Sequence, residues 1–295
     1  KQEMVQEAMF RIGKLEVPVN PVISANQPFF YRNKGSFQLF GDRQIGYCKP
    51  GRNIPFAIQN CPIMEQAIND KIRDFLLNPQ ERANLDVKKK ALTIRSNFKG
   101  ETINSTIKRH AFTDKVAGLQ FFVDVDTFFQ VNRGIIPLWL GYIEKLILKH
   151  KVGQGLLDLY CGVGIISQYL AKHFEKVVGI EVNSRLVENG NKVLKENNIN
   201  NAQFIVADAA RFNDYGFLYD TVIINPPRKG IDSVMTQVLI HNAPPVIIYS
   251  SCNPDTFARD VGALHQGGYA LDEVQPFDMF PQTQHSEVVG VLYKK

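Results

Sequence analysis

The carboxyl-terminal half of the chain alternates between short apolar runs and longer segments with helical spacing. Runs this short and apolar are typical of strands buried on both faces, and helices between them act as parallel crossovers. This alternation predicts an α/β fold with a doubly wound parallel sheet. The runs lie at residues 156–159, 177–180, 204–206, 221–224 and 246–249, and a last strand is expected over 286–293.

The preceding part of the chain has a different pattern and a different charge. Residues 1–118 carry 19 Lys and Arg against 11 Asp and Glu, a net +8, whereas residues 119–295 carry 15 against 18, a net −3. A basic front half suggests a part that binds a polyanion beside a catalytic part, although charge also varies between domains without any function. We expect a helix and linker at 1–25 packed on the catalytic domain, a smaller β-rich domain at 26–118, and the catalytic domain at 119–295.

Composition excludes several classes of protein. No apolar run approaches the roughly 18 residues that span a bilayer, so no membrane partner is expected. The 4 cysteines are too few for a disulfide scaffold in 295 residues, which favours reduced thiols in a cytoplasmic protein. We also expect the protein to be a monomer. The chain begins at Lys1, and we expect it to be truncated at its amino terminus.

Basic and aromatic residues alternate near the start of the β-rich region. Arg32 and Lys34 lie among Phe29, Tyr31 and Phe37. Such residues can follow phosphates and stack on bases, which would assign Arg32 and Lys34 to a nucleic-acid substrate. They can equally be the solvated and buried faces of a sheet.

A glycine turn follows the first strand of the α/β region. Asp158 to Gly164 reads DLYCGVG, Glu181 ends the second strand and Asp208 ends the third. Glycines let the backbone approach a ligand at the carboxyl edge of such a sheet, and Tyr160 is placed to face it. Acids at these strand ends favour an adenosine cofactor without a pyrophosphate, namely S-adenosylmethionine. Each acid could instead cap the following helix, and Tyr160 could serve packing alone.

Two further strand ends carry polar or reactive groups. Asn225-Pro226-Pro227 follows the fourth strand. In amino methyltransferases this motif is usually followed by an aromatic residue, but in this chain it is followed by Arg228. Cys252 follows the fifth strand and is placed to be a nucleophile, although a lone Cys is more often a small buried hydrophobe. We interpret Cys161, within the glycine turn, as structural.

Glu287 opens the last strand and is a candidate general base, with an exposed strand-end acid as the alternative. A thiol, a carboxylate and S-adenosylmethionine together suit one reaction. Uracil C5 is a weak nucleophile until a thiolate adds to C6, and a base must then remove the C5 proton so that the thiol can leave.

These motifs, taken in order, resemble those of the RNA 5-methyluridine methyltransferases. The resemblance covers residues 119–295 and implies a class I, Rossmann-like methyltransferase fold beside a smaller RNA-binding domain. The stretch Phe277 to Pro281 with His285, and Asn225 where many relatives have Asp, resemble the branch that methylates 23S ribosomal RNA. The five motifs are FQVN at 129–132, the glycine turn, 225–230, 250–254 and 285–288.

The resemblance also implies roles for individual residues. Cys252 would be the nucleophile and Glu287 the base. Cys61-Pro62 resembles the fourth ligand of an iron–sulfur cluster, but one Cys cannot hold a [4Fe-4S] cluster, so further cysteines outside this sequence would be required. Arg228, like Arg32 and Lys34, is assigned to the substrate. The implied cofactor contacts are Gln130, Tyr160, Glu181, Asn225 and Asp208.

Three alternatives remain open from the sequence. The substrate could be tRNA rather than ribosomal RNA. The enzyme could be an amino methyltransferase acting through Asn225-Pro226-Pro227, which needs no thiol. The chain could also be a non-catalytic RNA-binding or assembly factor with a degenerate methyltransferase fold, which would not bind S-adenosylmethionine.

Overall fold

The computed structural model describes residues 1–106, 111–125, 127–150 and 153–295. The chain forms two compact units. The larger unit combines residues 1–25 with residues 135–295, and the smaller unit comprises residues 26–134.

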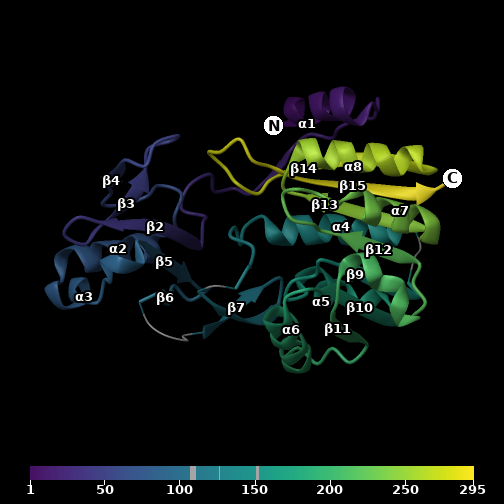
Figure 1. Ribbon diagram of the computed structural model, residues 1–295. Coiled ribbons are helices and arrows are strands. Elements are labelled where there is room, and N and C mark those ends of the chain that lie inside the picture. Colours follow the sequence, from purple (N-terminus) through teal and green to yellow (C-terminus); the bar gives the residue numbers. More distant parts are fainter. Residues whose placement is uncertain (107–110, 126, 151–152) are drawn as a thin grey trace. The chain divides into compact units, whose positions relative to one another are not determined.

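The larger unit is built on an eight-stranded sheet (Figure 1). Its centre is parallel, as the buried apolar runs predicted, and every residue of β9, β12 and β13 is buried. The last strand, β15, is antiparallel and lies between β13 and β14. The order is β1 (Ile23–Ser24), β14 (Tyr269–Asp278), β15 (Glu287–Lys294), β13 (Val246–Ser251), β12 (Thr221–Ile224), β9 (Gly155–Leu159), β10 (Lys176–Glu181) and β11 (Ala202–Val206).

Helices cover both faces of this sheet, and several of them begin at a residue whose side chain caps the helix. Asn183 and Asp232 accept backbone N–H groups at the starts of α6 and α7, and Asn253 does so for α8, with Pro254 in its first turn. The helices are α4 (Ile136–His150), α5 (Ile165–Leu170), η3 (Ala171–His173), α6 (Ser184–Glu196), η4 (Ala209–Tyr215), α7 (Ser233–Asn242) and α8 (Pro254–Gln266).

The amino-terminal helix forms an additional layer outside α8 (Figure 1). It consists of α1 (Gln2–Ala8) and a π-helical turn η1 (Met9–Gly13), in agreement with the helix expected within residues 1–25. Gly13 and Gly262 allow the two helices to cross closely, because a Cβ on Gly262 would lie 2.7 Å from the Gly13 carbonyl oxygen. The amino terminus is thereby held beside the start of α8.

The smaller unit holds a five-stranded antiparallel sheet and a two-stranded hairpin. Its core lies between the sheet and α2, with Phe37, Ile45, Ile72 and Phe75 buried. The sheet order is β4 (Pro55–Ala57), β3 (Gln44–Cys48), β2 (Lys34–Phe40), β5 (Ala91–Ser96) and β6 (Thr102–Asn104); the hairpin is β7 (Ala111–Val116) and β8 (Leu119–Asp124); the helices are α2 (Gln66–Leu77), α3 (Pro79–Ala83) and η2 (Val87–Lys89).

The domain boundary expected at residues 118–119 is wrong. Ala117 and Gly118 both have positive φ and form the two-residue turn of the β7–β8 hairpin, so the chain stays within the smaller unit. The units divide at residues 134–135 instead. Lys34 and Gly35 both belong to β2, although Gly often marks a turn.

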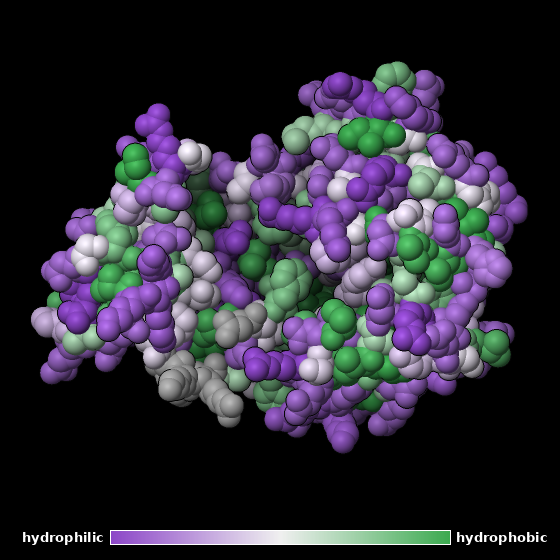
Figure 2. Space-filling model, viewed as in Figure 1, coloured by the Kyte–Doolittle hydropathy of each residue, from purple (hydrophilic) through white to green (hydrophobic). Residues whose placement is uncertain are grey.

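No helix in the described ranges is long and apolar enough to cross a membrane. On the face shown in Figure 2, hydrophobic residues are interspersed with hydrophilic ones.

Candidate active site

Sheet register brings the two candidate catalytic residues to one edge. Cys252 follows the last residue of β13, and Glu287 is the first residue of β15. The strands are antiparallel with Ser251 opposite Val288, so the end of one lies beside the start of the other. The Glu287 charge accordingly acts on the Cys252 thiol and raises its pKa, in addition to the larger effect of burial.

Glu287 is almost completely enclosed, with 2% of its surface exposed. Burial disfavours the charged carboxylate and raises the pKa of Glu287 to about 7, although a hydrogen bond from Ser250 acts in the opposite direction. The Ser250 hydroxyl lies 2.5 Å from Glu287 Oε1. The exposed strand-end interpretation of Glu287 is therefore wrong.

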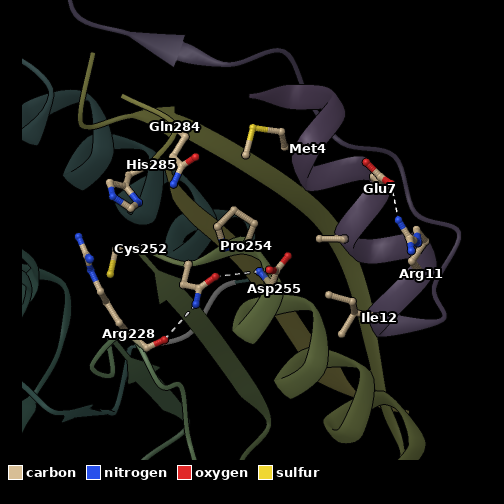
Figure 3. A pocket seen from close by; sticks show the side chains of 12 residues that line it. Met4, Glu7, Arg11, Ile12, Arg228, Cys252, Pro254, Asp255, Gln284 and His285 are labelled. Carbon is tan, nitrogen blue, oxygen red and sulfur yellow. Dashed lines mark hydrogen bonds and ion pairs between the residues drawn. The ribbon is translucent and has the colours of Figure 1, made fainter. Parts of the chain in front are cut away.

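Arg228 is the cation that favours the Cys252 thiolate. Its guanidinium points to the thiol in Figure 3, and through its charge and a hydrogen bond it lowers the pKa that burial and Glu287 raise. The Arg228 carbonyl oxygen accepts hydrogen bonds from Asn253 Nδ2 and Thr256 Oγ1, each 3.2 Å long. These bonds fix the backbone of the Asn225–Arg228 loop against α8.

Cys252 opens into a cavity of about 670 Å³ (Figure 3). Four segments of the larger unit line the cavity: the amino-terminal helix, the loop at Arg228, the segment at 252–255 and the loop before β15. Its volume is within the range of sites that enclose a ligand of drug size. The lining residues are Met4, Glu7, Ala8, Arg11, Ile12, Arg228, Cys252, Asn253, Pro254, Asp255, Gln284 and His285.

A second group of residues lies at the turn between β9 and α5. Tyr160, Gly162 and Gly164 all have positive φ. A Cβ added to Gly162 would meet no atom within 4 Å, so this backbone borders open space. Glu181 faces the turn from the end of β10, and its carboxylate accepts the N–H groups of Gly162 at 3.2 Å and Asn183 at 2.9 Å.

Asp158 beneath this turn retains an unused acceptor. It is 1% exposed, Ser167 donates to its Oδ2, and its Oδ1 has no hydrogen-bond partner. Burial raises the pKa of Asp158 to about 7. This site combines exposed backbone at Gly162, the Glu181 carboxylate, and the unpaired Asp158 Oδ1. Such acceptors fit a ligand with hydroxyl and amino donors, as S-adenosylmethionine has.

The alternative role as a helix cap applies to only one of the two strand-end acids, Glu181 and Asp208. Glu181 does not cap α6, because Asn183 does. Asp208 does cap η4, accepting the Ala210 N–H at 2.9 Å. Cys161 packs with Phe204 in the core, as expected of a structural thiol, while Tyr160 is half-buried against the main core.

The remaining candidate residues belong to the smaller unit. Gln130 is half-buried, and its carbonyl oxygen accepts a hydrogen bond from Asn33. Arg32 and Lys34 are half-buried, and Arg32 Nε donates to the Lys34 carbonyl at 3.0 Å. Phe37 lies in the core, so the buried-face alternative accounts for it, whereas Phe29 is 44% exposed.

Cys61 is buried and packs beside Tyr47, whose hydroxyl donates to its sulfur at 3.6 Å. Among the described residues, no group of three or more His, Cys, Asp or Glu side chains could hold a metal ion.

Sequence reasoning missed two residues beside Glu287. Trp139 of α4 donates its indole N–H to Ser250 Oγ at 3.2 Å, and Ser250 in turn contacts Glu287. The only available signal was Ser250 next to the Cys252 motif, since nothing in the spacing connects residues 139 and 250.

Known proteins with similar sequences include several that are named RNA or tRNA methyltransferases. A family described as tRNA (uracil-5-)-methyltransferase matches residues 69–295. An uncharacterized RNA methyltransferase of Thermosynechococcus vestitus is 30% identical over 99% of this chain and 78% of its own length. The tRNA (uracil(54)-C(5))-methyltransferase of Schizosaccharomyces pombe is 30% identical, covering 100% of this chain and 61% of the relative.

A crystal structure gives the same result for the fold. The tRNA (uracil-54, C5)-methyltransferase of Pyrococcus abyssi, solved in complex with S-adenosyl-L-homocysteine, superposes with a TM-score of 0.79 at 25% identity. The match covers 99% of this chain and 82% of the archaeal one. These findings confirm the expected class I methyltransferase fold and S-adenosylmethionine as cofactor. The chain is an S-adenosylmethionine-dependent RNA methyltransferase, and it belongs to the tRNA (uracil-5-)-methyltransferase family.

Proposed function

We propose that this enzyme methylates C5 of a uridine in 23S ribosomal RNA through a covalent bond between Cys252 and uracil C6. The observation that carries the proposal is the placement of a thiol, an arginine and a buried carboxyl at one edge of the sheet. Cys252 opens into the cavity with Arg228 beside it, and Glu287 is close enough to raise the pKa of the Cys252 thiol.

In the first step, the Cys252 thiolate adds to C6. An S–C6 bond forms, and the electron pair of the C5=C6 double bond moves to C5 and the O4 carbonyl as an enolate. Arg228 stabilises the thiolate before the attack, which matters because burial and Glu287 favour the neutral thiol. When bound, S-adenosylmethionine would supply an electrophilic methyl group. C5 of the enolate bonds to this methyl group, and the sulfonium sulfur keeps the electron pair of the S–CH3 bond that breaks.

In the second step, Glu287 removes the C5 proton. The C–H electron pair re-forms the C5=C6 double bond, the C6–S bond breaks, and its electron pair returns to Cys252. A base with a pKa of about 7 suits this task near neutral pH, because it is ionised often enough to act and basic enough to accept the proton.

The cofactor would bind at the β9–α5 turn, with Glu181 accepting hydrogen bonds from the ribose hydroxyls. Tyr160, Asn225, Asp208 and Gln130 are the further contacts that we assign to it. Glu181→Ala should weaken S-adenosylmethionine binding by about 1.5–3 kcal/mol, the scale of a hydrogen bond to a charged group. Unchanged affinity by calorimetry would refute the ribose assignment, and a complete loss of folding by circular dichroism would invalidate the variant.

Two observations favour different RNA substrates. The Phe277 to Pro281 stretch with His285 favours 23S ribosomal RNA, and His285 lines the cavity. The relatives from Schizosaccharomyces pombe and Pyrococcus abyssi are named for uridine 54 of tRNA, which makes tRNA the second candidate. The smaller unit, with Arg32 and Lys34, would hold the RNA in either case.

To test this proposal, the enzyme is incubated with 23S ribosomal RNA and with tRNA in separate reactions, and methylated uridines are mapped by mass spectrometry. The proposal expects 5-methyluridine in ribosomal RNA and none with Cys252→Ala. Methylation of tRNA alone would select the second candidate. Full activity of Cys252→Ala would favour an amino methyltransferase, and failure to bind S-adenosylmethionine would favour a non-catalytic factor.

A further inference from the structure

Ser250 lies between Trp139 and Glu287 in a fully buried chain of hydrogen bonds. Ser250 is 0% exposed, Trp139 1% and Glu287 2%. Trp139 Nε1 is 3.2 Å from Ser250 Oγ, and Ser250 Oγ is 2.5 Å from Glu287 Oε1. The three side chains come from α4, β13 and β15, so the arrangement depends on the tertiary fold.

The chemistry of the three groups sets the direction of the chain. An indole N–H can only donate, so Ser250 Oγ accepts from Trp139. Its own hydroxyl hydrogen is then available to donate to Glu287 Oε1. A hydroxyl donating to a carboxyl oxygen favours the ionised form, and this opposes the burial that favours the protonated form.

Among the described residues near Glu287, the Ser250 hydroxyl is a donor in direct contact with the carboxyl group. β14 places Phe277 opposite Glu287, and Phe277 is apolar and buried. The charged or titratable groups around this end of β15 are Cys252, Arg228 and His285, which line the cavity, and Lys1 and Asp278, which are paired with each other at 2.5 Å. Of these, Arg228 acts on the Cys252 thiol.

We propose that Ser250, held in orientation by Trp139, is a positioning residue that keeps Glu287 ionised for removal of the C5 proton. The inference rests on the proposed function and adds to it a reason why a carboxyl this deeply buried can work as a base. Without the Ser250 hydroxyl, burial acts unopposed and Glu287 stays protonated to higher pH.

The test follows the covalent RNA–enzyme adduct through its decay at a series of pH values. Enzyme, RNA substrate and S-adenosylmethionine are mixed for a single turnover, and the methylated RNA still bonded to protein is measured on denaturing gels. Ser250→Ala should form the adduct at the wild-type rate but release it at least roughly tenfold more slowly below neutral pH. Raising the pH should restore release, because Glu287 then ionises without help.

Two further variants and a control define the effect. Trp139→Phe should slow release in the same direction by a smaller factor, because the Ser250 hydroxyl remains but is free to turn. Glu287→Gln should hold the adduct at every pH. Thr221→Val removes a buried hydroxyl from neighbouring β12, where it contacts Asp220 at 2.9 Å, and should leave the pH profile unchanged.

Each outcome separates the inference from the proposed function. A wild-type pH profile in Ser250→Ala would overturn the inference, and so would an adduct in that variant that persists at every pH. The proposed function would survive both results, because adduct formation depends on Cys252. If circular dichroism shows that Ser250→Ala does not fold, the pH profile of adduct release in Trp139→Phe tests the inference instead. A Trp139→Phe profile that matches the wild type would overturn the inference.

Discussion

Two carboxyl groups in this enzyme are almost completely buried. Glu287 and Asp158 are 2% and 1% exposed, and burial raises the pKa of each to about 7. The folded protein therefore holds protons that the unfolded chain releases near pH 4. Their contribution to stability is fully present below the unfolded pKa and is lost as the pH rises through about 7.

Replacing Glu287 with Gln should remove its share of this pH dependence. Gln is neutral at every pH, so it avoids the penalty of a buried charge that the wild type incurs above about pH 7. The melting temperature of Glu287→Gln relative to the wild type should therefore be higher at about pH 8.5 than at about pH 5.5. Differential scanning fluorimetry measures it, with the exposed Glu7→Gln as control. A difference that stays constant with pH would contradict the burial argument.

At the scale of single residues, the sequence indicated the candidate reactive groups but not the residues that contact them. Cys252 and Glu287 were identifiable because each lies at a strand end within a motif. Ser250 and Trp139 were not, because a contact between residues 111 positions apart depends on how α4 packs on the sheet. Asp208 illustrates the opposite case, since an acid after a strand also has the chemistry of a helix cap, and the structure uses it so.

Among the elements, the β9–α5 turn depends on glycine for two different reasons. Gly162 and Gly164 both have positive φ, which strains other residues. A Cβ on Gly162 would enter open space, whereas a Cβ on Gly164 would overlap the ring of Phe204. Gly179 and Gly190 border the same ring. The strand β11 thus packs an aromatic ring into a space left by three glycines.

The two glycines should therefore respond differently to the same substitution. Gly162→Ala should lower the free energy of unfolding by about 1–3 kcal/mol, the scale of left-handed backbone strain in a residue other than glycine. Gly164→Ala should lower it further, because the buried Phe204 ring must also move. Urea unfolding monitored by circular dichroism measures both variants. Equal losses, or a greater loss for Gly162→Ala, would contradict the packing described here.

The loop between β14 and β15 is fastened by Lys1. The Lys1 ammonium donates to Asp278 Oδ1 at 2.5 Å, to the Phe280 carbonyl at 2.9 Å and to the His285 carbonyl at 2.6 Å. These acceptors lie at both ends of the loop that leads into Glu287. Lys1 thus connects the start of the amino-terminal helix to the loop that leads into Glu287.

Removing this side chain should loosen the loop without unfolding the protein. Lys1→Met should increase amide hydrogen exchange in residues 279–286 by roughly tenfold or more, because three bonds to a charged donor are lost. Mass spectrometry of peptides from this loop measures the exchange. Lys14→Met, at an exposed position after η1, is the matched control. Unchanged exchange in Lys1→Met would show that the loop is ordered by other contacts.

Elements with strong local patterns were predictable, and non-local pairings were not. The buried runs of the parallel sheet were recognisable because their composition alone defines strands covered on both faces. The insertion of β15 between β13 and β14 depends on pairing between distant segments. Gly35 shows the same limit: glycine often marks a turn, but this one pairs with Ile94 within β2, where a Cβ would overlap the Phe37 ring.

In the molecule as a whole, the positive charge follows the division into units. Residues 26–134 carry 17 Lys and Arg against 10 Asp and Glu, a net +7, and the remaining residues carry 17 against 19, a net −2. The excess therefore belongs to the smaller unit, which supports its proposed role in holding RNA. The sequence showed this contrast in net charge but placed the domain boundary at residues 118–119 instead of 134–135, because a hairpin turn and a linker have similar composition.

The adduct formed by Glu287→Gln tests the central claim most directly, namely that Cys252 bonds to the uridine and Glu287 completes the reaction. The variant is incubated with RNA substrate and S-adenosylmethionine, digested with protease and nuclease, and analysed by mass spectrometry. The account predicts a peptide in which Cys252 carries a methylated uridine nucleotide, and no such peptide from Cys252→Ala. Normal release of methylated RNA by Glu287→Gln, or a nucleotide bound to protein in the absence of Cys252, would contradict it.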